Sequence, residues 1–234
     1  RIRSKGNFMN YEKFLEYERR AYSTVYAEGE STYHDNIIIE FAKRFLPEMA
    51  IDKKALVLDI GCGPGTFLQA AQDLGYTNTI GITLSDADVD MCKKKNFTTI
   101  KSSMSDLDIE DNTADLIWCR HAIEHSPYPL FTLYEFHRVL KKDAHVWIEV
   151  PSPNNQRAFM HEFNPNHYSL LGERMWQGLF EKAGFELLNN YDYNIDVEVP
   201  AGKVNEKSYI FVLKRSQTPV KEIFKTKYGI EIEG

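Results

Sequence analysis

The stretch Val57-Leu-Asp-Ile-Gly-Cys-Gly-Pro-Gly-Thr-Phe-Leu68 decides the fold. An apolar strand runs into a turn of alternating glycines, and a helix pattern begins directly after the turn. A doubly wound α/β sheet binds a nucleotide-like ligand at such a turn, because glycine lets the backbone approach the ligand closely. The sequence therefore predicts a ligand site at the end of this strand.

The glycine spacing disfavours a dinucleotide as that ligand. A dinucleotide-binding turn has the pattern Gly-x-Gly-x-x-Gly, and Thr66 stands where the third glycine would be. Asp59, just before the turn, would repel a pyrophosphate, whereas a carboxylate can hold the ammonium of an amino-acid moiety directly or through water. We therefore expect a ligand that carries positive charge.

Strand and helix patterns alternate on both sides of the turn. Two amphipathic helices are predicted before it, at 10–28 and 36–45. Strands are predicted at 55–60, 79–83, 98–101, 115–119, 145–150, 185–199 and 208–214, with helices at 65–74, 86–95, 129–140 and 169–183. This alternation is typical of parallel βα units and predicts an α/β fold with about seven strands.

The composition excludes several other classes of protein. Hydrophobic residues make up 43% of the 234 residues and charged residues 26%, as in ordinary globular domains. A net charge of −6 disfavours nucleic acid as a partner, and no apolar run approaches the roughly 18 residues of a membrane span. Three scattered cysteines favour a reducing, cytoplasmic setting over a disulfide framework.

Two motifs carry a resemblance to a known family. Asp59-Ile-Gly-Cys-Gly-Pro-Gly65 resembles the first motif of the class I S-adenosylmethionine-dependent methyltransferases, and residues 104–125 resemble the family's adenine loop, fourth strand and following segment. The similarity extends over about residues 55–214 by element order. It implies S-adenosylmethionine as cofactor and a Rossmann-like, doubly wound, mostly parallel seven-stranded sheet with helices on both faces and an antiparallel last strand.

The resemblance also suggests how the chain is divided. We expect an N-terminal helical extension or lid over 1–50, a methyltransferase domain over 51–215 and a tail over 216–234. Within the domain, 151–168 is rich in Pro, Asn and His and is expected to be a loop that faces the methyl acceptor. Tyrosines at 11, 17, 22, 26 and 33 form a helical stripe that either packs on the sheet or closes over the ligands.

Two expected cofactor contacts depart from the common family pattern. Gly81-Ile-Thr-Leu-Ser85 is similar to the cyclopropane fatty acid synthase branch, which implies that Thr83 and Asp88 share the ribose. The family's adenine-loop Asp falls at Ser103, so that its hydroxyl would meet the adenine amino group and the Met104 N–H a ring nitrogen. The full expected set is Asp59, Gly61, Cys62, Gly63, Gly65, Thr83, Leu84, Asp88, Ser103, Met104 and His121.

The catalytic candidates follow from the chemistry of the transfer. Methyl transfer from a sulfonium depends on positioning, and a hydroxyl acceptor must also lose a proton to a base or be acidified by a metal. His125, His167 and Glu124 are the catalytic candidates, and His161 is a further histidine in the acceptor loop. The alternative is that His121 and His125 only form a cofactor-loop wall and a hydrogen bond at a helix start.

A divalent metal is a second way to use the same residues. His121-x-x-Glu124-His125 resembles the Glu-x-x-Glu-His cluster of two metal-using branches, the ubiquinone-pathway O-methyltransferases and the small-RNA terminal 2′-O-methyltransferases. A bound metal would use His121, Glu124, His125 and His167. A histidine in place of the first Glu shifts the preference from Mg²⁺ toward Mn²⁺, Fe²⁺, Co²⁺ or Zn²⁺.

The sequence thus predicts a methyltransferase that acts on a hydroxyl, or an amine, of a small metabolite such as a sugar or natural-product intermediate. The alternatives are carbon methylation of a lipid, RNA 2′-O-methylation, and a methyltransferase-like binding module without catalysis. The missing basic amphipathic helix argues against the lipid alternative, and the net charge argues against RNA.

Overall fold

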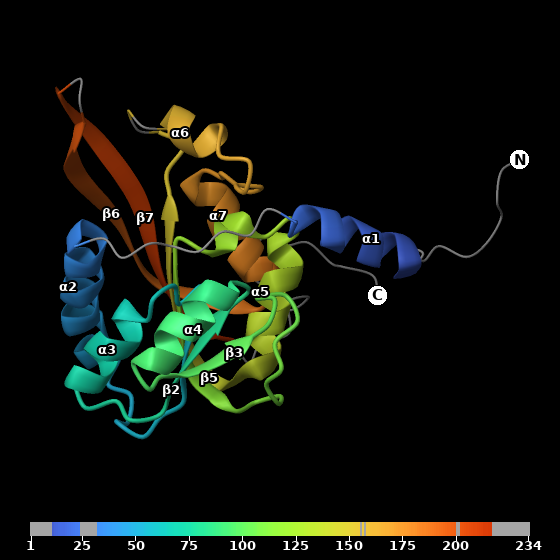
Figure 1. Cartoon of the computed structure of the whole chain (residues 1–234), viewed down its shortest axis with the longest axis vertical. Helices are drawn as coiled ribbons and strands as arrows, with labels where there is room; N and C mark the ends of the chain where they lie inside the picture. The colour runs from blue at the N-terminus through green and yellow to red at the C-terminus, as the bar shows by residue number, and fades with distance from the viewer. Residues whose placement is uncertain (1–10, 24–31, 155, 157, 200–201, 217–234) are drawn as a thin grey trace, which may run out of the picture.

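The computed structural model describes residues 11–23, 32–154, 156, 158–199 and 202–216. Helices cover both faces of a central sheet (Figure 1). In chain order the elements are α1 Tyr11–Ala21, α2 Thr32–Glu48, β1 Val57–Ile60, α3 Thr66–Asp73, β2 Thr79–Thr83, α4 Asp86–Lys94, β3 Thr98–Lys101, β4 Ala114–Arg120, the 3₁₀ turn η1 Ile123–His125, α5 Pro129–Val139, β5 Leu140–Pro151, α6 Ala158–Glu162, α7 Glu173–Lys182, β6 Phe185–Val199 and β7 Gly202–Arg215.

The sheet has seven strands in the order β3-β2-β1-β4-β5-β7-β6. The pairs among β1 to β5 are parallel, and β7 is antiparallel to both of its neighbours. This arrangement confirms the predicted Rossmann-like fold with its antiparallel last strand. The strand order reverses between β1 and β4, and a doubly wound sheet places its ligand crevice at that point.

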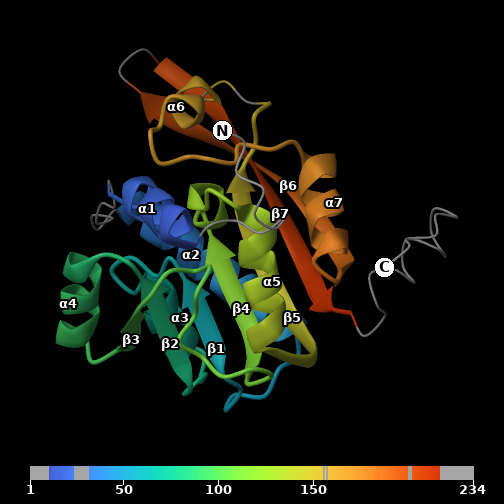
Figure 2. The ribbon, with the colours of Figure 1, turned by 90° about the vertical axis from the view of Figure 1, so that its right-hand side faces the viewer.

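Two apolar layers hold the helices to the sheet. Figure 2 shows helices on both sides of the sheet. On one face, α5 and α7 bury side chains such as Phe136 and Trp176. On the other, α2 and α3 cover a stack in which Phe67 lies 4.4 Å from Trp118 and Trp118 lies 3.7 Å from Trp147, between ring centroids. Stacked aromatic rings bury large apolar areas, so this layer fixes β1, β4 and β5 against α2 and α3.

Several boundaries differ from the predicted ones. The last two strands form a hairpin paired from Phe185 with Arg215 to Val199 with Gly202, whereas β5 pairs with β7 only as far as Ser208. The hairpin therefore projects beyond the sheet (Figure 1). Residues 203–207 carry a single apolar side chain, Val204, so no apolar alternation marks them and the prediction began that strand at 208.

Other differences concern helices and one strand start. The predicted loop at 151–168 contains the short helix α6, and the helix predicted from 169 begins at Glu173. The helix predicted over 10–28 ends at Ala21, and 24–31 lie outside the described residues. Strand β5 begins at Leu140 instead of 145, because Leu140 pairs with Ala114 across a register shift. Among the described residues, no helix is long and apolar enough to span a bilayer.

We expect Trp147→Ala to lower the free energy of unfolding by about 3–5 kcal/mol, because it leaves a cavity between Trp118 and the α2 side chains. Urea denaturation followed by circular dichroism measures this loss. The matched control is Leu188→Ala on β6, where the side chain is 46% exposed and a change within about 0.5 kcal/mol is expected. Equal losses in the two variants would contradict the importance of the stack.

Candidate active site

The turn after β1 is shaped by close contacts that only glycine permits. Gly61, Gly63 and Gly65 have φ values of +71°, +48° and +87°. A Cβ on Gly61 would lie 2.7 Å from the Ala122 Cβ, and a Cβ on Gly65 would lie 2.7 Å from the Phe97 ring. Positive φ and lack of room both exclude larger residues, so the turn brings its backbone directly against the segment that follows β4.

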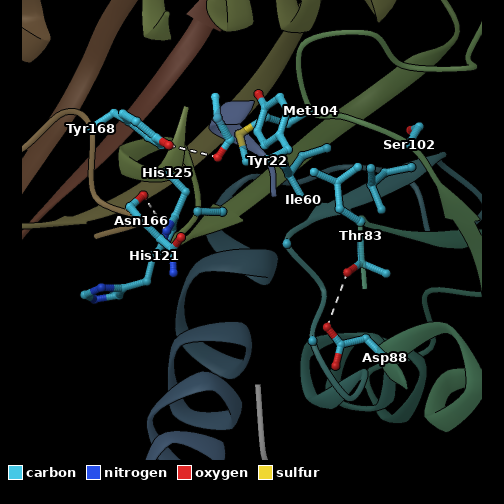
Figure 3. A pocket seen from close by; sticks show the side chains of 16 residues that line it. Tyr22, Ile60, Thr83, Asp88, Ser102, Met104, His121, His125, Asn166 and Tyr168 are labelled. Atoms are coloured by element: carbon cyan, nitrogen blue, oxygen red, sulfur yellow. Dashed lines mark hydrogen bonds between the residues drawn. The ribbon is translucent and has the colours of Figure 1, made fainter. Parts of the chain in front are cut away.

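A cleft, here called the main cleft, opens beside this turn (Figure 3). Its walls come from the end of α1, the glycine turn, the end of β2, residues 102–104, the segment after β4 and residues 166–168. Seven of the predicted cofactor residues line it: Gly61, Gly63, Thr83, Leu84, Asp88, Met104 and His121.

Thr83 and Asp88 meet at the β2 end of the main cleft. The Thr83 hydroxyl donates to the Asp88 carboxylate at 3.3 Å, and both residues are buried (Figure 3). Asp88 lies in the first turn of α4. The hydroxyl of Ser85, the N-cap residue just before this helix, accepts a hydrogen bond from the Asp88 N–H at 3.2 Å. The structure thus joins the hydroxyl and the carboxylate that the prediction assigned jointly to the ribose.

Two of the predicted residues face a second cavity instead. Asp59 and Cys62 line this second cavity together with Arg120. Gly61 borders both spaces. Nine of the eleven expected cofactor residues, all except Gly65 and Ser103, therefore line one or both of these spaces.

Ser103 lies differently from its expected position. Its hydroxyl accepts the Ser105 N–H at 3.2 Å within its own loop, and Ser102, not Ser103, lines the main cleft beside Met104. Gly65 lines neither space among the described residues and serves as the residue before the first turn of α3. The prediction was therefore off by one residue in this loop. Strand and helix periodicity cannot show which residue of an irregular loop faces a cleft.

Three of the predicted catalytic side chains come together at the other end of the main cleft. One donor atom each from Glu124, His125 and His167 lie within 4.8 Å of one another, and we call these residues the Glu124 cluster. The Glu124 carbonyl accepts the N–H groups of Tyr168 and Ser169 at 2.8 and 3.1 Å, which ties the turn after β4 to the segment before α7.

Hydrogen bonds and ring contacts orient the two histidines of the cluster. The His125 Nδ1–H donates to the Asn166 carbonyl at 3.0 Å, which leaves the lone pair on Nε2 (Figure 3). The His125 and His167 rings are nearly perpendicular with centroids 4.6 Å apart, and His161 stacks on His167 at 5.4 Å. His161 also lies 3.5 Å from Glu206 of the projecting hairpin.

His121 lies between two carboxylates, one of which belongs to the cluster. Its φ is +47°, its Nδ1 lies 3.4 Å from Glu124 Oε1 and its Nε2 lies 3.4 Å from Glu149 Oε1. Glu149 is buried and pairs with Arg120 at 2.7 Å. His121 therefore stands outside the three convergent donors, in contrast to the expected set of four metal ligands.

The charges in this network are set by burial and by neighbours. Burial would lower the pKa of His121, but Glu149 and Glu124 outweigh it and raise the pKa to about 10. Burial would raise the pKa of Glu124, but His121 outweighs it, so the Glu124 carboxyl stays ionised. Burial lowers the pKa of His167 to about 4, helped by the other histidines and opposed by Glu124. At neutral pH the cluster thus combines a carboxylate with a neutral imidazole.

Two members of this network were missed by the sequence interpretation. Glu149 is the buried charged residue of an otherwise apolar run at 146–150, and such an interruption was a usable signal. Arg120, at the end of β4, had no comparable signal, because a charged residue at a strand end is usually exposed.

The end of α1 closes one side of the main cleft. Ala21 and Tyr22 line it, the Tyr168 hydroxyl donates to the Ala21 carbonyl at 2.8 Å, and the Tyr128 hydroxyl donates to Glu18. Of the predicted tyrosine stripe, Tyr17 is 46% exposed, while position 26 and the side chains at 11 and 33 lie outside the described part.

The comparisons with known proteins agree with this fold. The chain belongs to the methyltransferase domain family, whose model matches residues 33–190, and methyltransferases of this class use S-adenosylmethionine. An uncharacterized protein of Methanocaldococcus jannaschii is 30% identical over 156 residues, which cover 67% of this chain and 66% of that protein.

A second curated protein and a solved structure are also similar to this chain. A sterol 24-C-methyltransferase of Aspergillus fumigatus is 24% identical over 192 residues, 71% of this chain and 48% of that enzyme. The chain thus matches between about half and two thirds of the length of these two curated relatives. A solved S-adenosylmethionine-dependent methyltransferase from Archaeoglobus fulgidus has a TM-score of 0.62 at 18% identity and covers 88% of this chain and 100% of its own, so it shares the fold.

We expect Gly61→Ala to abolish binding of S-adenosylhomocysteine, because the added methyl collides with Ala122 and φ is positive. Calorimetric titration measures the binding. Gly178→Ala on α7 is the matched control, since nothing lies within 4 Å of its added Cβ. Binding by the Gly61 variant at wild-type affinity would show that the turn is not part of the cofactor site.

We expect the stabilising effect of His121 to depend on pH. The folded chain holds the His121 proton more tightly than the unfolded chain, whose pKa is near 6.5, so the contribution is complete below 6.5 and is lost as pH rises toward about 10. Urea denaturation of wild type and His121→Gln across this range should show a difference that shrinks with pH.

The control for this titration is His137→Gln. Burial lowers the pKa of His137, so its contribution changes below pH 6.5 and stays constant above it. A constant difference between wild type and the His121 variant from pH 6.5 to 10 would contradict the raised pKa.

Proposed function

We propose that this chain transfers the methyl group of S-adenosylmethionine to a hydroxyl group of a small metabolite, such as a sugar or a natural-product intermediate. The observation that supports an oxygen acceptor is the place of the Glu124 cluster, because His125 belongs both to the cluster and to the wall of the main cleft. Groups that can accept a proton therefore lie beside the space in which the transfer would occur.

The residues on either side of the glycine turn fit the cofactor. The Thr83 hydroxyl and Asp88 carboxylate would hold the ribose, and Met104 would lie along the adenine. Asp59 in the second cavity would hold the ammonium of the amino-acid end. Gly61, which borders both spaces and has no room for a Cβ, lets a ligand pass close to the backbone.

The transfer step needs little acid–base chemistry beyond one proton. S-adenosylmethionine supplies the methyl, and its sulfur keeps the electron pair of the broken bond while the acceptor oxygen forms the new one. The ionised Glu124 and the neutral His167 are placed to receive the acceptor's proton, and His125 to orient the oxygen. Tyr22 and Tyr168 narrow the opening and limit access of water.

The test uses the purified chain, S-adenosylmethionine with a trideuterated methyl group, and a set of acceptors that includes sugars, phenols, amines, a sterol and an RNA oligonucleotide. Mass spectrometry detects the label, and NMR locates it. Label on oxygen of a small molecule is expected, and label on nitrogen, on sterol carbon or on RNA would replace the proposed acceptor. Cofactor binding without transfer to any class would favour a binding module.

We expect Glu124→Gln to lower kcat by about 10²- to 10⁴-fold while S-adenosylhomocysteine binds within about threefold of wild type, because the carboxylate serves the transfer and not the cofactor. Steady-state kinetics with the acceptor found above and calorimetry separate the two effects. Glu110→Gln, at an exposed position outside the site, is the control. An unchanged kcat would remove Glu124 from the mechanism.

A further inference from the structure

The Glu124 cluster has the dimensions of a site for one cation. Its three donor atoms lie within 4.8 Å of one another, whereas two ligands bound at about 2.1 Å to one ion are at most roughly 4.2 Å apart. Small side-chain rotations would therefore close the three donors on a single ion. The two segments that carry them are already joined by the hydrogen bonds to the Glu124 carbonyl.

Two donors of the cluster, Glu124 and His167, have buried atoms with unmet hydrogen-bonding capacity among the described residues. The Glu124 side chain is 1% exposed, and apart from His121 at 3.4 Å neither carboxylate oxygen has a hydrogen-bond partner among the described residues. His167 Nδ1 is likewise buried and accepts no hydrogen bond there. Burying an ionised carboxylate in this state is costly, and buried charges are normally paired or coordinate metals.

Neighbouring residues orient these donors as outer partners do in metal sites. The His125 Nδ1–H is held by the Asn166 carbonyl, which presents Nε2 as the donor atom. Glu124 is held on its other side by His121, which in turn contacts Glu149. Such outer partners fix the direction of a ligand's lone pair and raise its affinity for metal.

From this geometry we propose that Glu124, His125 and His167 bind one divalent transition-metal ion at the end of the main cleft, with His121 as an outer partner and not a ligand. Two imidazoles and one carboxylate favour borderline ions such as Mn²⁺, Fe²⁺, Co²⁺ or Zn²⁺ over Mg²⁺ and Ca²⁺, which prefer oxygen. Three protein ligands leave at least one position open. Because His125 also lines the main cleft, that position is accessible to a molecule in the cleft.

The role of the ion rests on the proposed function, whereas its binding does not. In the open position it takes the hydroxyl oxygen of the acceptor and lowers the pKa of that hydroxyl. Glu124 and His167 then hold the ion instead of receiving the proton, which leaves to solvent. The oxygen forms its bond to the methyl carbon, and the cofactor's sulfur keeps the electron pair of the broken sulfur–methyl bond. The reaction is redox-neutral and needs no other reactant.

The test titrates Co²⁺ into the chelator-treated full chain and follows its visible absorption together with the heat of binding. One ion per chain is expected. His121→Gln removes only an outer partner and should lower the affinity for Co²⁺ by roughly 10- to 100-fold. Glu124→Gln and His167→Gln each remove a ligand and should lower that affinity further. His145→Gln, near the opposite end of β5, is the matched control and should bind Co²⁺ as wild type does.

Each variant is also titrated with S-adenosylhomocysteine to show that it has folded. If the ligand variants do not fold, pulsed electron paramagnetic resonance of Mn²⁺ in wild-type chain labelled with ¹⁵N-histidine decides the point, because two coordinated imidazole nitrogens are expected. Absence of Co²⁺ and Mn²⁺ binding by chain that binds S-adenosylhomocysteine would overturn the metal site and leave the proposed transfer intact. Binding that the Glu124 and His167 variants retain in full would overturn it as well.

Discussion

The contact between Gly61 and Ala122 is the constraint on which the site depends. It presses the turn after β1 against the segment after β4 so closely that a single Cβ on Gly61 would come within 2.7 Å of the Ala122 Cβ. Ala122 lies directly between His121 and the turn that carries Glu124. The same contact therefore shapes the glycine turn and places the proton-accepting groups beside it, so that the two halves of the site cannot move independently.

A buried row of alternating charges extends this coupling into the sheet. Arg120, Glu149, His121 and Glu124 follow one another as cation, anion, cation and anion, with successive contacts at 2.7, 3.4 and 3.4 Å. Charges removed from water are costly unless each has a partner, and removal of one partner leaves the next uncompensated. Glu124 thus owes its ionised state chiefly to His121, which contacts it directly and is itself in contact with Glu149.

The sequence was most informative where a residue type has one dominant physical meaning. Alternating glycines located the turn, and the spacing of Thr83 and Asp88 across the start of a helix brought the two side chains together as predicted. It was least informative about irregular backbone. His121 has a left-handed backbone conformation, and its ring contacts Glu149. Nothing in the residue pattern around His121 indicates this conformation.

The remaining differences also have physical causes. Ser102 lines the main cleft at the place where Ser103 was expected. The prediction missed this because a loop has no periodicity that shows which residue faces the cleft. The second strand of the projecting hairpin was predicted to begin only at 208 because residues 203–207 carry a single apolar side chain, Val204. Convergence of Glu124 and His167, which are 43 residues apart, depends on tertiary contacts that only the structure reveals.

The tryptophan stack makes the molecule its own optical reporter. The chain has three tryptophans, at 118, 147 and 176, and all are fully buried. Trp118 stacks on Trp147 at 3.7 Å and also forms part of the wall of the second cavity beside Asp59. Electronic coupling within this pair gives the near-ultraviolet spectrum a signature of the intact core, and occupation of the second cavity changes the surroundings of one ring. Fluorescence emission can therefore follow ligand entry at the Asp59 side of the turn without any added label.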